Sequence, residues 1–115
     1  MPVFSPREIF LDYLRRYAAK DLDGIASMFS EEVTLRDWNL SVKGRDAAIA
    51  ETRKNFESAA SIHIEVLHVL ESADSVAGEL CILVDGNIEL FVVDVLDFDV
   101  EGQITAIRAF LGRGD

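Results

Sequence analysis

The sequence predicts an α+β domain in which a curved antiparallel sheet carries three N-terminal helices on one face. Helical spacing of apolar residues is confined to the first half of the chain, up to about residue 56. The second half contains four long strand-like runs joined by short polar or glycine-containing connections, which favour antiparallel hairpins over parallel crossovers. A strongly curved sheet that faces three helices can enclose a pocket.

The first helix is predicted from Pro6 to about Ala19. Ser5 precedes it in a capping-box pattern, proline occupies the first helical position, and apolar residues follow at helical spacing. Asp21 is then predicted to cap a short second helix that ends near Ser30.

A strand pair and a third helix follow. Alternating residues predict a strand at 33–38, with a hairpin partner at 40–42, before a third helix at 46–56. The four long strands are predicted at 61–71, 76–85, 88–99 and 103–111.

The composition is typical of a single folded domain that spans residues 1–115. Hydrophobic residues make up 50% of the chain, which is enough to build a core. The formal net charge of −10 disfavours phosphate backbones and anionic lipids, so we expect neither nucleic acid nor a membrane as a partner. The lone cysteine, Cys81, fits a reducing compartment. We see no secretory signal and no membrane-spanning run, and we expect a cytoplasmic protein.

Asp94 is the most unusual residue of the chain. Because alternate residues of a strand share a face, it shares its face with apolar residues only: Ile88, Leu90, Val92, Leu96 and Phe98. An ionised carboxylate there is unfavourable, so we expect Asp94 to be paired, to be protonated through desolvation, or to border a cavity. Arg108 is a candidate partner if the strand register brings the two together.

Two further polar residues belong to the same predicted surface. Asp37 ends the apolar stripe formed by Val33 and Leu35, at or near the mouth of the cavity; the alternative is an ordinary turn aspartate. Tyr13 lies on the apolar face of the first helix; the alternative is a core tyrosine whose hydroxyl finds a local partner.

Other kinds of site are not indicated. No set of His, Cys and carboxylate residues has zinc spacing, and no glycine-rich phosphate loop is found, so we expect neither a metal nor a cofactor. His68 shares a predicted strand face with apolar residues and is interpreted as a buried core histidine.

Two stretches of sequence resemble a known family. The segment AAKDLDGIASMFSEEVTLRD (18–37) and the segment VVDVLDFD (92–99), followed by GQI, resemble the NTF2-like superfamily with its cystatin-like cone. Within the superfamily the resemblance is to ketosteroid isomerase, or steroid Δ-isomerase, and to SnoaL-like proteins. In that isomerase family a tyrosine on the first helix and two aspartates on strands form the site. Tyr13, Asp37 and Asp94 match those positions.

The resemblance implies a chemistry for these three residues. Asp37 would be the general base that moves a proton between two carbons of a small apolar carbonyl compound. Tyr13 and a protonated Asp94 would donate hydrogen bonds to the dienolate oxygen. The resemblance also implies that no cofactor is needed and that the protein is a homodimer.

The predicted substrate pocket differs from that of the family. Phe29 and Thr52 stand where some members have tyrosines that support the catalytic one, and Leu111 replaces an aromatic residue that lines the steroid site. We therefore expect a smaller pocket or one shaped for another carbonyl compound. Its predicted lining residues are Phe10, Tyr17, Phe29, Leu35, Trp38, Phe56, Leu90, Val92, Ala109 and Leu111.

Two alternatives remain open at this point. One is another enzyme of the superfamily, such as a SnoaL-type polyketide cyclase or a dehydratase. The other is a non-catalytic domain that binds small molecules or dimerises. A filled core, or an ion pair between Asp94 and Arg108, would favour the non-catalytic domain.

Overall fold

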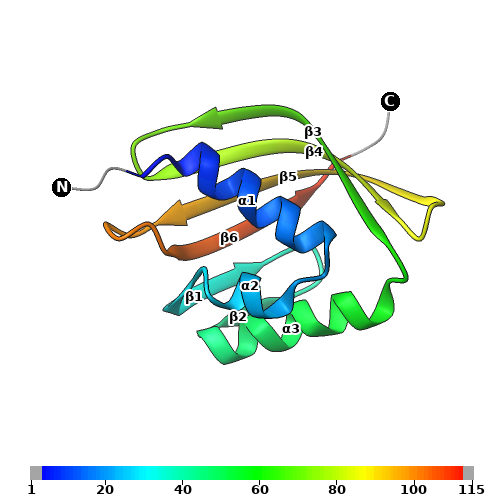
Figure 1. Cartoon of the computed structure of the whole chain (residues 1–115), viewed down its shortest axis with the longest axis horizontal. Helices are drawn as coiled ribbons and strands as arrows, with labels where there is room; N and C mark the ends of the chain where they lie inside the picture. Colours follow the sequence, from blue (N-terminus) through cyan, green and yellow to red (C-terminus); the bar gives the residue numbers. More distant parts are fainter. Residues whose placement is uncertain (1–3, 113–115) are drawn as a thin grey trace.

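The computed structural model describes residues 4–112 and contains helices on one side of a single sheet (Figure 1). The helices are α1 (Pro6–Ala18), α2 (Leu22–Ala26) and α3 (Arg45–Ser58). The strands are β1 (Phe29–Arg36), β2 (Ser41–Lys43), β3 (Ile62–Glu71), β4 (Ser75–Val84), β5 (Ile88–Phe98) and β6 (Ile104–Leu111). The α+β class and the order of elements are confirmed. Residues 1–3 and 113–115 lie outside the described range. The two ends of the predicted domain, 1–115, therefore fall outside it.

The strands form one six-stranded sheet in the order β2-β1-β6-β5-β4-β3. Four of its neighbouring pairs are antiparallel, but β1 and β6 run parallel, with Leu35 opposite Ile107. The prediction of a wholly antiparallel sheet is therefore wrong at this pair. The signals in the sequence were local hairpins, whereas β1 and β6 are separated by α3 and the three preceding long strands, so no hairpin constrains their direction.

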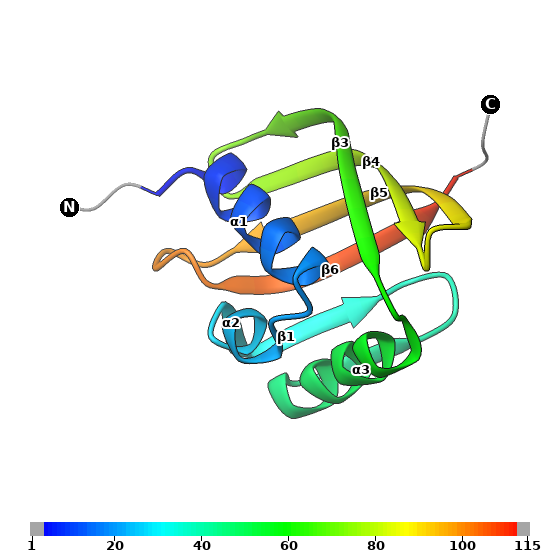
Figure 2. The ribbon, with the colours of Figure 1, turned by 45° about the vertical axis from the view of Figure 1, so that its right-hand side comes forward.

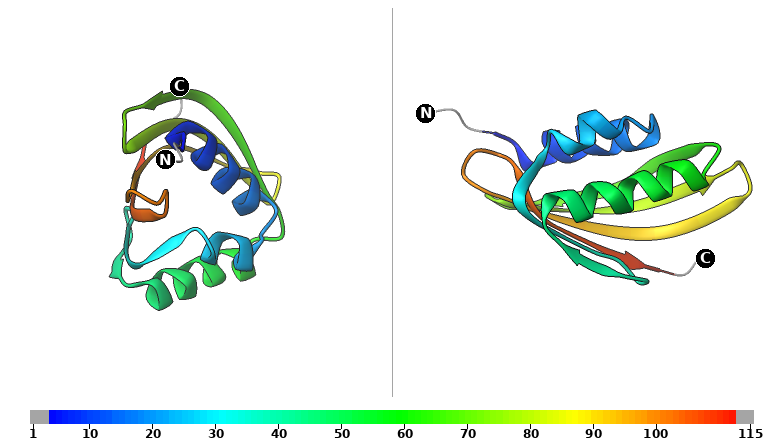
Figure 3. Two further views of the ribbon diagram at one scale, coloured as in Figure 1. Left: turned by 60° about the vertical axis from the view of Figure 1, so that its left-hand side comes forward. Right: turned by 90° about the horizontal axis from the view of Figure 1, so that it is seen from below.

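The sheet is strongly curved, and the helices cover its concave face. Figure 2 shows β3 bending across the molecule towards the end of α3, and Figure 3 shows the helices gathered on one side of the sheet. Helix α1 packs against β3 and β4, while α3 packs against β1 and β2. The core between helices and sheet consists of fully buried side chains from both, including Phe10, Ile25, Leu80 and Leu96.

The predicted helix caps are present. The hydroxyl of Ser5 accepts a hydrogen bond from the backbone N–H of Glu8 at 3.2 Å, and the carboxylate of Asp21 accepts one from Gly24 at 3.0 Å. The carboxylate of Glu71 accepts a further bond from the backbone N–H of Arg7 at 3.0 Å. This bond ties the start of α1 to the end of β3, and so fixes the direction of the helix across the sheet.

The second helix is shorter than predicted. It ends at Ala26 rather than near Ser30, and Phe29 belongs to β1. The helical spacing of apolar residues is overridden by strand pairing, because Phe29 lies opposite Ile104 of β6, and the N–H of Ile104 donates to the carbonyl of Met28 at 2.8 Å.

A β-bulge changes the orientation of residues in β3. Val66 lies opposite Leu80 and His68 lies opposite Glu79, so Leu67 is an extra residue on β3. The extra residue reverses the alternation of faces beyond this point. The prediction of a buried core histidine is therefore wrong, and His68 is exposed.

The convex face of the sheet carries a cluster of apolar residues. It presents Cys81, Phe91, Val93, Val95 and Phe110, of which Phe110 is 56% exposed and Val93 is 38% exposed. None of the described helices is both long and apolar enough to cross a membrane.

Candidate active site

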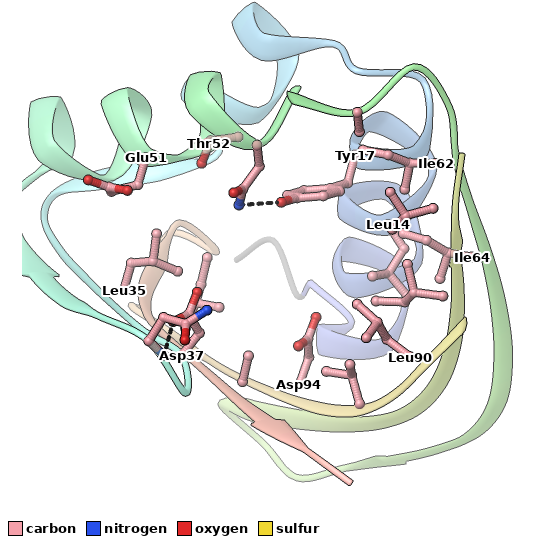
Figure 4. Close-up of a pocket in the computed structure, with 18 of the residues that line it drawn as sticks. Leu14, Tyr17, Leu35, Asp37, Glu51, Thr52, Ile62, Ile64, Leu90 and Asp94 are labelled. Atoms are coloured by element: carbon pink, nitrogen blue, oxygen red, sulfur yellow. Dashed lines mark hydrogen bonds between the residues drawn. The ribbon is translucent and has the colours of Figure 1, made fainter. Parts of the chain in front are cut away.

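A cavity of about 260 Å³ lies between α1, α3 and the concave face of the sheet. Figure 4 shows Tyr17 and Thr52 on its helical side, with Asp37 and Asp94 on the side formed by the sheet. Strands β3, β4 and β5 contribute an apolar wall, which consists of Ile62, Ile64, Ile82, Val84, Leu90 and Val92. The volume lies just below the roughly 300–1,000 Å³ usual for drug-sized ligands, which favours a small ligand.

Asp94 lies in the floor of this cavity, as its position in the strand predicts. Its side chain comes from the middle of β5, is only 9% exposed and lines the cavity. Burial raises the pKa of Asp94 from 3.8 to about 7. Within the described part of the chain, no ion pair or hydrogen bond engages its carboxyl group. A large fraction of Asp94 is therefore protonated at neutral pH and can donate a hydrogen bond into the cavity.

Arg108 is not the partner of Asp94. It lies on the convex face, where its guanidinium binds the carboxylate of Asp97 with nitrogen–oxygen distances of 2.8 and 3.3 Å. This contact lowers the pKa of Asp97. The residue of β6 that lies opposite Asp94 is Ala109, which has no polar side chain. The strand register thus pairs Arg108 with Asp97, which lies outside the cavity, and leaves Asp94 unpaired.

Tyr13 lies on α1 and also lines the cavity. The side chain is 5% exposed, and its pKa is raised well above the usual value, chiefly by burial and then by Tyr17 and Asp94. The Tyr13 hydroxyl therefore keeps its proton and, like Asp94, is a hydrogen-bond donor.

Asp37 follows directly after β1, in a tight turn. Its Oδ1 accepts hydrogen bonds from the backbone N–H groups of Asn39 at 2.7 Å and Leu40 at 3.0 Å. The turn interpretation is therefore correct, but it is compatible with a site, because Asp37 also lines the cavity. The turn fixes the carboxylate through one oxygen and leaves Oδ2 without a partner among the described residues.

The predicted pocket residues separate into two groups. Six of the ten line the cavity: Tyr17, Leu35, Trp38, Leu90, Val92 and Ala109. Phe10, Phe29 and Phe56 are instead packed in the core, and Leu111 is half exposed outside the cavity. Phe29 is displaced from the cavity because β1 begins there. Trp38, 44% exposed, lies where the cavity wall meets solvent.

The polar face of α3 was not predicted as part of the site. Glu51, Thr52, Asn55 and Ser58 all line the cavity. Glu51 and Thr52 each lie three or four residues before Asn55, and Ser58 lies three after it, so the four share one helical face, and this pattern could have indicated a polar wall. The pattern was not interpreted as part of the site, because that side of the helix has no apolar stripe.

No metal site is found. Among residues 4–112, no group of three or more His, Cys, Asp or Glu side chains is arranged to hold a metal ion.

The architecture and the cavity together define the NTF2-like class of folds. An NTF2-like protein of Cytophaga hutchinsonii has the same fold, with a TM-score of 0.80, 12% sequence identity, and coverage of 97% of this chain and 93% of that one. The family model of the SnoaL-like domain matches residues 10–107. This chain belongs to the SnoaL-like family.

Two relatives have described activities. The steroid Δ-isomerase of Nocardioides simplex is 31% identical over 106 residues, which cover 90% of this chain and 86% of that protein. The second is SalBIII, an epoxide hydrolase/cyclase-like enzyme of pyran ring formation in the polyether salinomycin. Its structure has a TM-score of 0.82 and 29% identity, over 93% of this chain and 90% of that one.

Proposed function

We propose that the protein catalyses cofactor-free proton transfer, an allylic isomerisation, in a small apolar carbonyl compound. Asp37 removes a proton from the carbon next to the carbonyl group, and the electron pair of that bond moves onto the carbonyl oxygen. Tyr13 and Asp94 donate hydrogen bonds to the oxygen as its charge develops. Asp37 then returns the proton to the distal carbon of the dienolate, which completes the shift of the double bond.

The observation that carries this proposal is the unpaired, buried Asp94 in the same cavity that Tyr13 lines. A protonated Tyr13 and a protonated Asp94, both buried, can stabilise a developing negative charge well, because few water molecules compete for it. The resemblance to the steroid Δ-isomerase supports the same assignment of roles.

A second candidate is an epoxide-opening cyclisation, which the similarity to SalBIII favours. In that reaction Asp94 would give its proton to the epoxide oxygen as the carbon–oxygen bond breaks. Asp37 would take the proton of the attacking hydroxyl as the new carbon–oxygen bond forms. Asp37 acts as the base in both reactions, whereas Asp94 donates a hydrogen bond in isomerisation and transfers its proton in cyclisation. The two reactions also differ in the substrate that the cavity accepts.

Isomerisation of cyclohex-3-en-1-one to its conjugated isomer tests the proposal, because the product absorbs in the ultraviolet. We expect the wild type to accelerate the reaction and Asp37→Asn to lose about 10²–10⁴-fold in rate. Asp99→Asn is a matched control. Asp99 also accepts two backbone N–H bonds in a turn, from Glu101 and Gln103, but it lies outside the cavity.

Three results would contradict isomerisation. They are no acceleration by the wild type of either isomerisation or solvent deuterium exchange, equal rates for the wild type and Asp37→Asn, or equal losses in Asp37→Asn and Asp99→Asn. Turnover of a hydroxy-epoxide with no turnover of the ketone would establish the cyclisation instead.

A further inference from the structure

Tyr17 and Asn55 form a hydrogen bond across the cavity wall, from α1 to α3. The Nδ2 of Asn55 donates to the hydroxyl oxygen of Tyr17 at 3.0 Å. Because the tyrosine oxygen accepts this bond, its own O–H is available to donate elsewhere. Figure 4 shows this bond at the helical side of the cavity, across from Asp37 and Asp94.

The orientation of Tyr17 is fixed by its neighbours. Its ring meets that of Phe56 edge to face, with centroids 4.9 Å apart, and lies 5.8 Å from the ring of Tyr13. The pKa of Tyr17 is raised, because burial and then the charges of Asp94 and Asp37 outweigh the lowering effect of Asn55. The Tyr17 hydroxyl is therefore fixed in position and protonated, and it can donate a hydrogen bond.

The neighbouring hydroxyls on α3 are already in use. Thr52 donates to the carbonyl of Ala48 at 2.9 Å, and Ser58 donates to the carbonyl of Asn55 at 3.1 Å. Of the hydroxyls of Thr52, Ser58 and Tyr17, that of Tyr17 therefore remains free to donate to a ligand.

The charges around the cavity define the kind of group that this wall accepts. Asp37, Glu51 and Asp94 supply carboxyl groups, and no Lys or Arg from the described residues lines the cavity. An anionic group would meet unfavourable electrostatic interactions there. A neutral oxygen can accept the bond from Tyr17 without that cost.

We propose that the Tyr17–Asn55 pair is a second polar contact for the ligand, so that preferred ligands carry a neutral hydroxyl or carbonyl oxygen at the end that faces α3. This inference rests on the proposed function, in which Tyr13 and Asp94 hold the first oxygen. It defines the substrate class as carbonyl compounds with two separated oxygen functions.

Binding of two naphthols of nearly equal size tests this contact. In 6-hydroxymethyl-2-naphthol and 6-ethyl-2-naphthol, the phenol mimics the dienolate oxygen, and the distal groups differ by a hydroxyl in place of a methyl. The readout is the ratio of their dissociation constants, measured by fluorescence or calorimetry. We expect Tyr17→Phe, which keeps the ring, to shift the ratio about ten-fold towards the ethyl compound.

Asn55→Asp provides an independent variant. Its carboxylate is nearly the same shape as the amide but accepts the Tyr17 proton, so we expect the ratio to shift in the same direction as in Tyr17→Phe. Asn87→Asp, in the exposed turn between β4 and β5, adds the same charge away from the cavity and should leave the ratio unchanged. We also expect 6-hydroxy-2-naphthoate, which is anionic, to bind at least ten-fold more weakly than the hydroxymethyl compound.

The outcomes separate this inference from the proposed function. Tight binding with an unchanged ratio in Tyr17→Phe, or equal weakening of both naphthols, would overturn the second contact and leave the isomerase proposal intact. Comparable binding of the naphthoate would overturn the requirement for a neutral group. If neither neutral naphthol binds, the inference fails together with the cavity as a ligand site, whereas loss of ketone turnover alone contradicts only the proposed chemistry.

Discussion

Gly78 lies directly opposite Asp94 in the β4–β5 pair, on the same concave face of the sheet. The space that a side chain at Gly78 would occupy is filled by the ring of Phe10, which would lie 2.3 Å from an added Cβ. Ala109 lies opposite Asp94 on the other neighbouring strand. Asp94 is therefore flanked by residues that offer neither a charge nor a hydrogen-bonding side chain, and this accounts for a pKa raised by burial alone.

Replacement of Gly78 by alanine should disturb this arrangement. Because the added methyl group overlaps the Phe10 ring, we expect Gly78→Ala to lower the free energy of unfolding by about 1–3 kcal/mol, measured by chemical denaturation. In Phe10→Leu the ring is absent, so the same Gly78→Ala change should cost less. If the effects of the two substitutions on the free energy of unfolding are simply additive, overlap between the added methyl group and the Phe10 ring does not cause the loss of stability.

The stability of the protein should depend on the protonation of Asp94. The folded state keeps this proton up to about pH 7, whereas the unfolded chain loses it near 3.8. The contribution of Asp94 to stability therefore falls as the pH rises between these values, by roughly 4 kcal/mol in total. Asp94→Asn cannot ionise, so its stability relative to the wild type should rise over this range and then level off. Denaturation of the wild type and of Asp94→Asn at a series of pH values measures the difference.

Enzymatic activity should follow the same proton. If a neutral Asp94 is required as a donor, kcat/KM for the ketone should fall about ten-fold per pH unit above about pH 7. Asp94→Asn retains a donor that does not titrate, so its lower activity should lack this decline. A wild-type profile that stays level well above pH 7 would rule out the donor role.

We propose that a second copy of the chain covers the apolar cluster on the convex face. Exposed Val93 and Phe110 lie side by side on this face, which favours association over exposure to water. Light scattering should give about twice the chain mass of 12.8 kDa, and Val93→Glu should shift the mass towards the monomer. Val100→Glu, at a position 87% exposed in the β5–β6 connection, is the control. A monomeric wild type at concentrations used for structural work would contradict the proposal.

Much of the fold and the main features of the cavity floor could be predicted from local pattern. The alternation of residues in β5 correctly places Asp94 on the buried face, and the caps at Ser5 and Asp21 locate two helix starts. These predictions succeed because each depends on residues close together in the chain. The roles of Tyr13, Asp37 and Asp94 in catalysis stay predictions, since they depend on a ligand as well as on the protein.

Features that depend on distant segments were not predictable in the same way. The partner of Arg108 is decided by the register between β5 and β6, and the strand at Phe29 forms because of pairing with β6. The Tyr17–Asn55 bond joins two helices through residues that are 38 positions apart in sequence. Local periodicity carries no information on such contacts, although the polar spacing of α3 was visible.

The bulge at Leu67 has a consequence for the behaviour of the protein in concentrated solution. Strand β3 is one edge of the sheet, and its outer backbone groups are a potential template for a strand of another molecule. The extra residue divides this edge into two short segments with different registers, and the exposed Glu65 and His68 flank the division. A straight incoming strand cannot pair along its full length. The bulge that directs His68 towards solvent is therefore expected to protect the open β3 edge against aggregation.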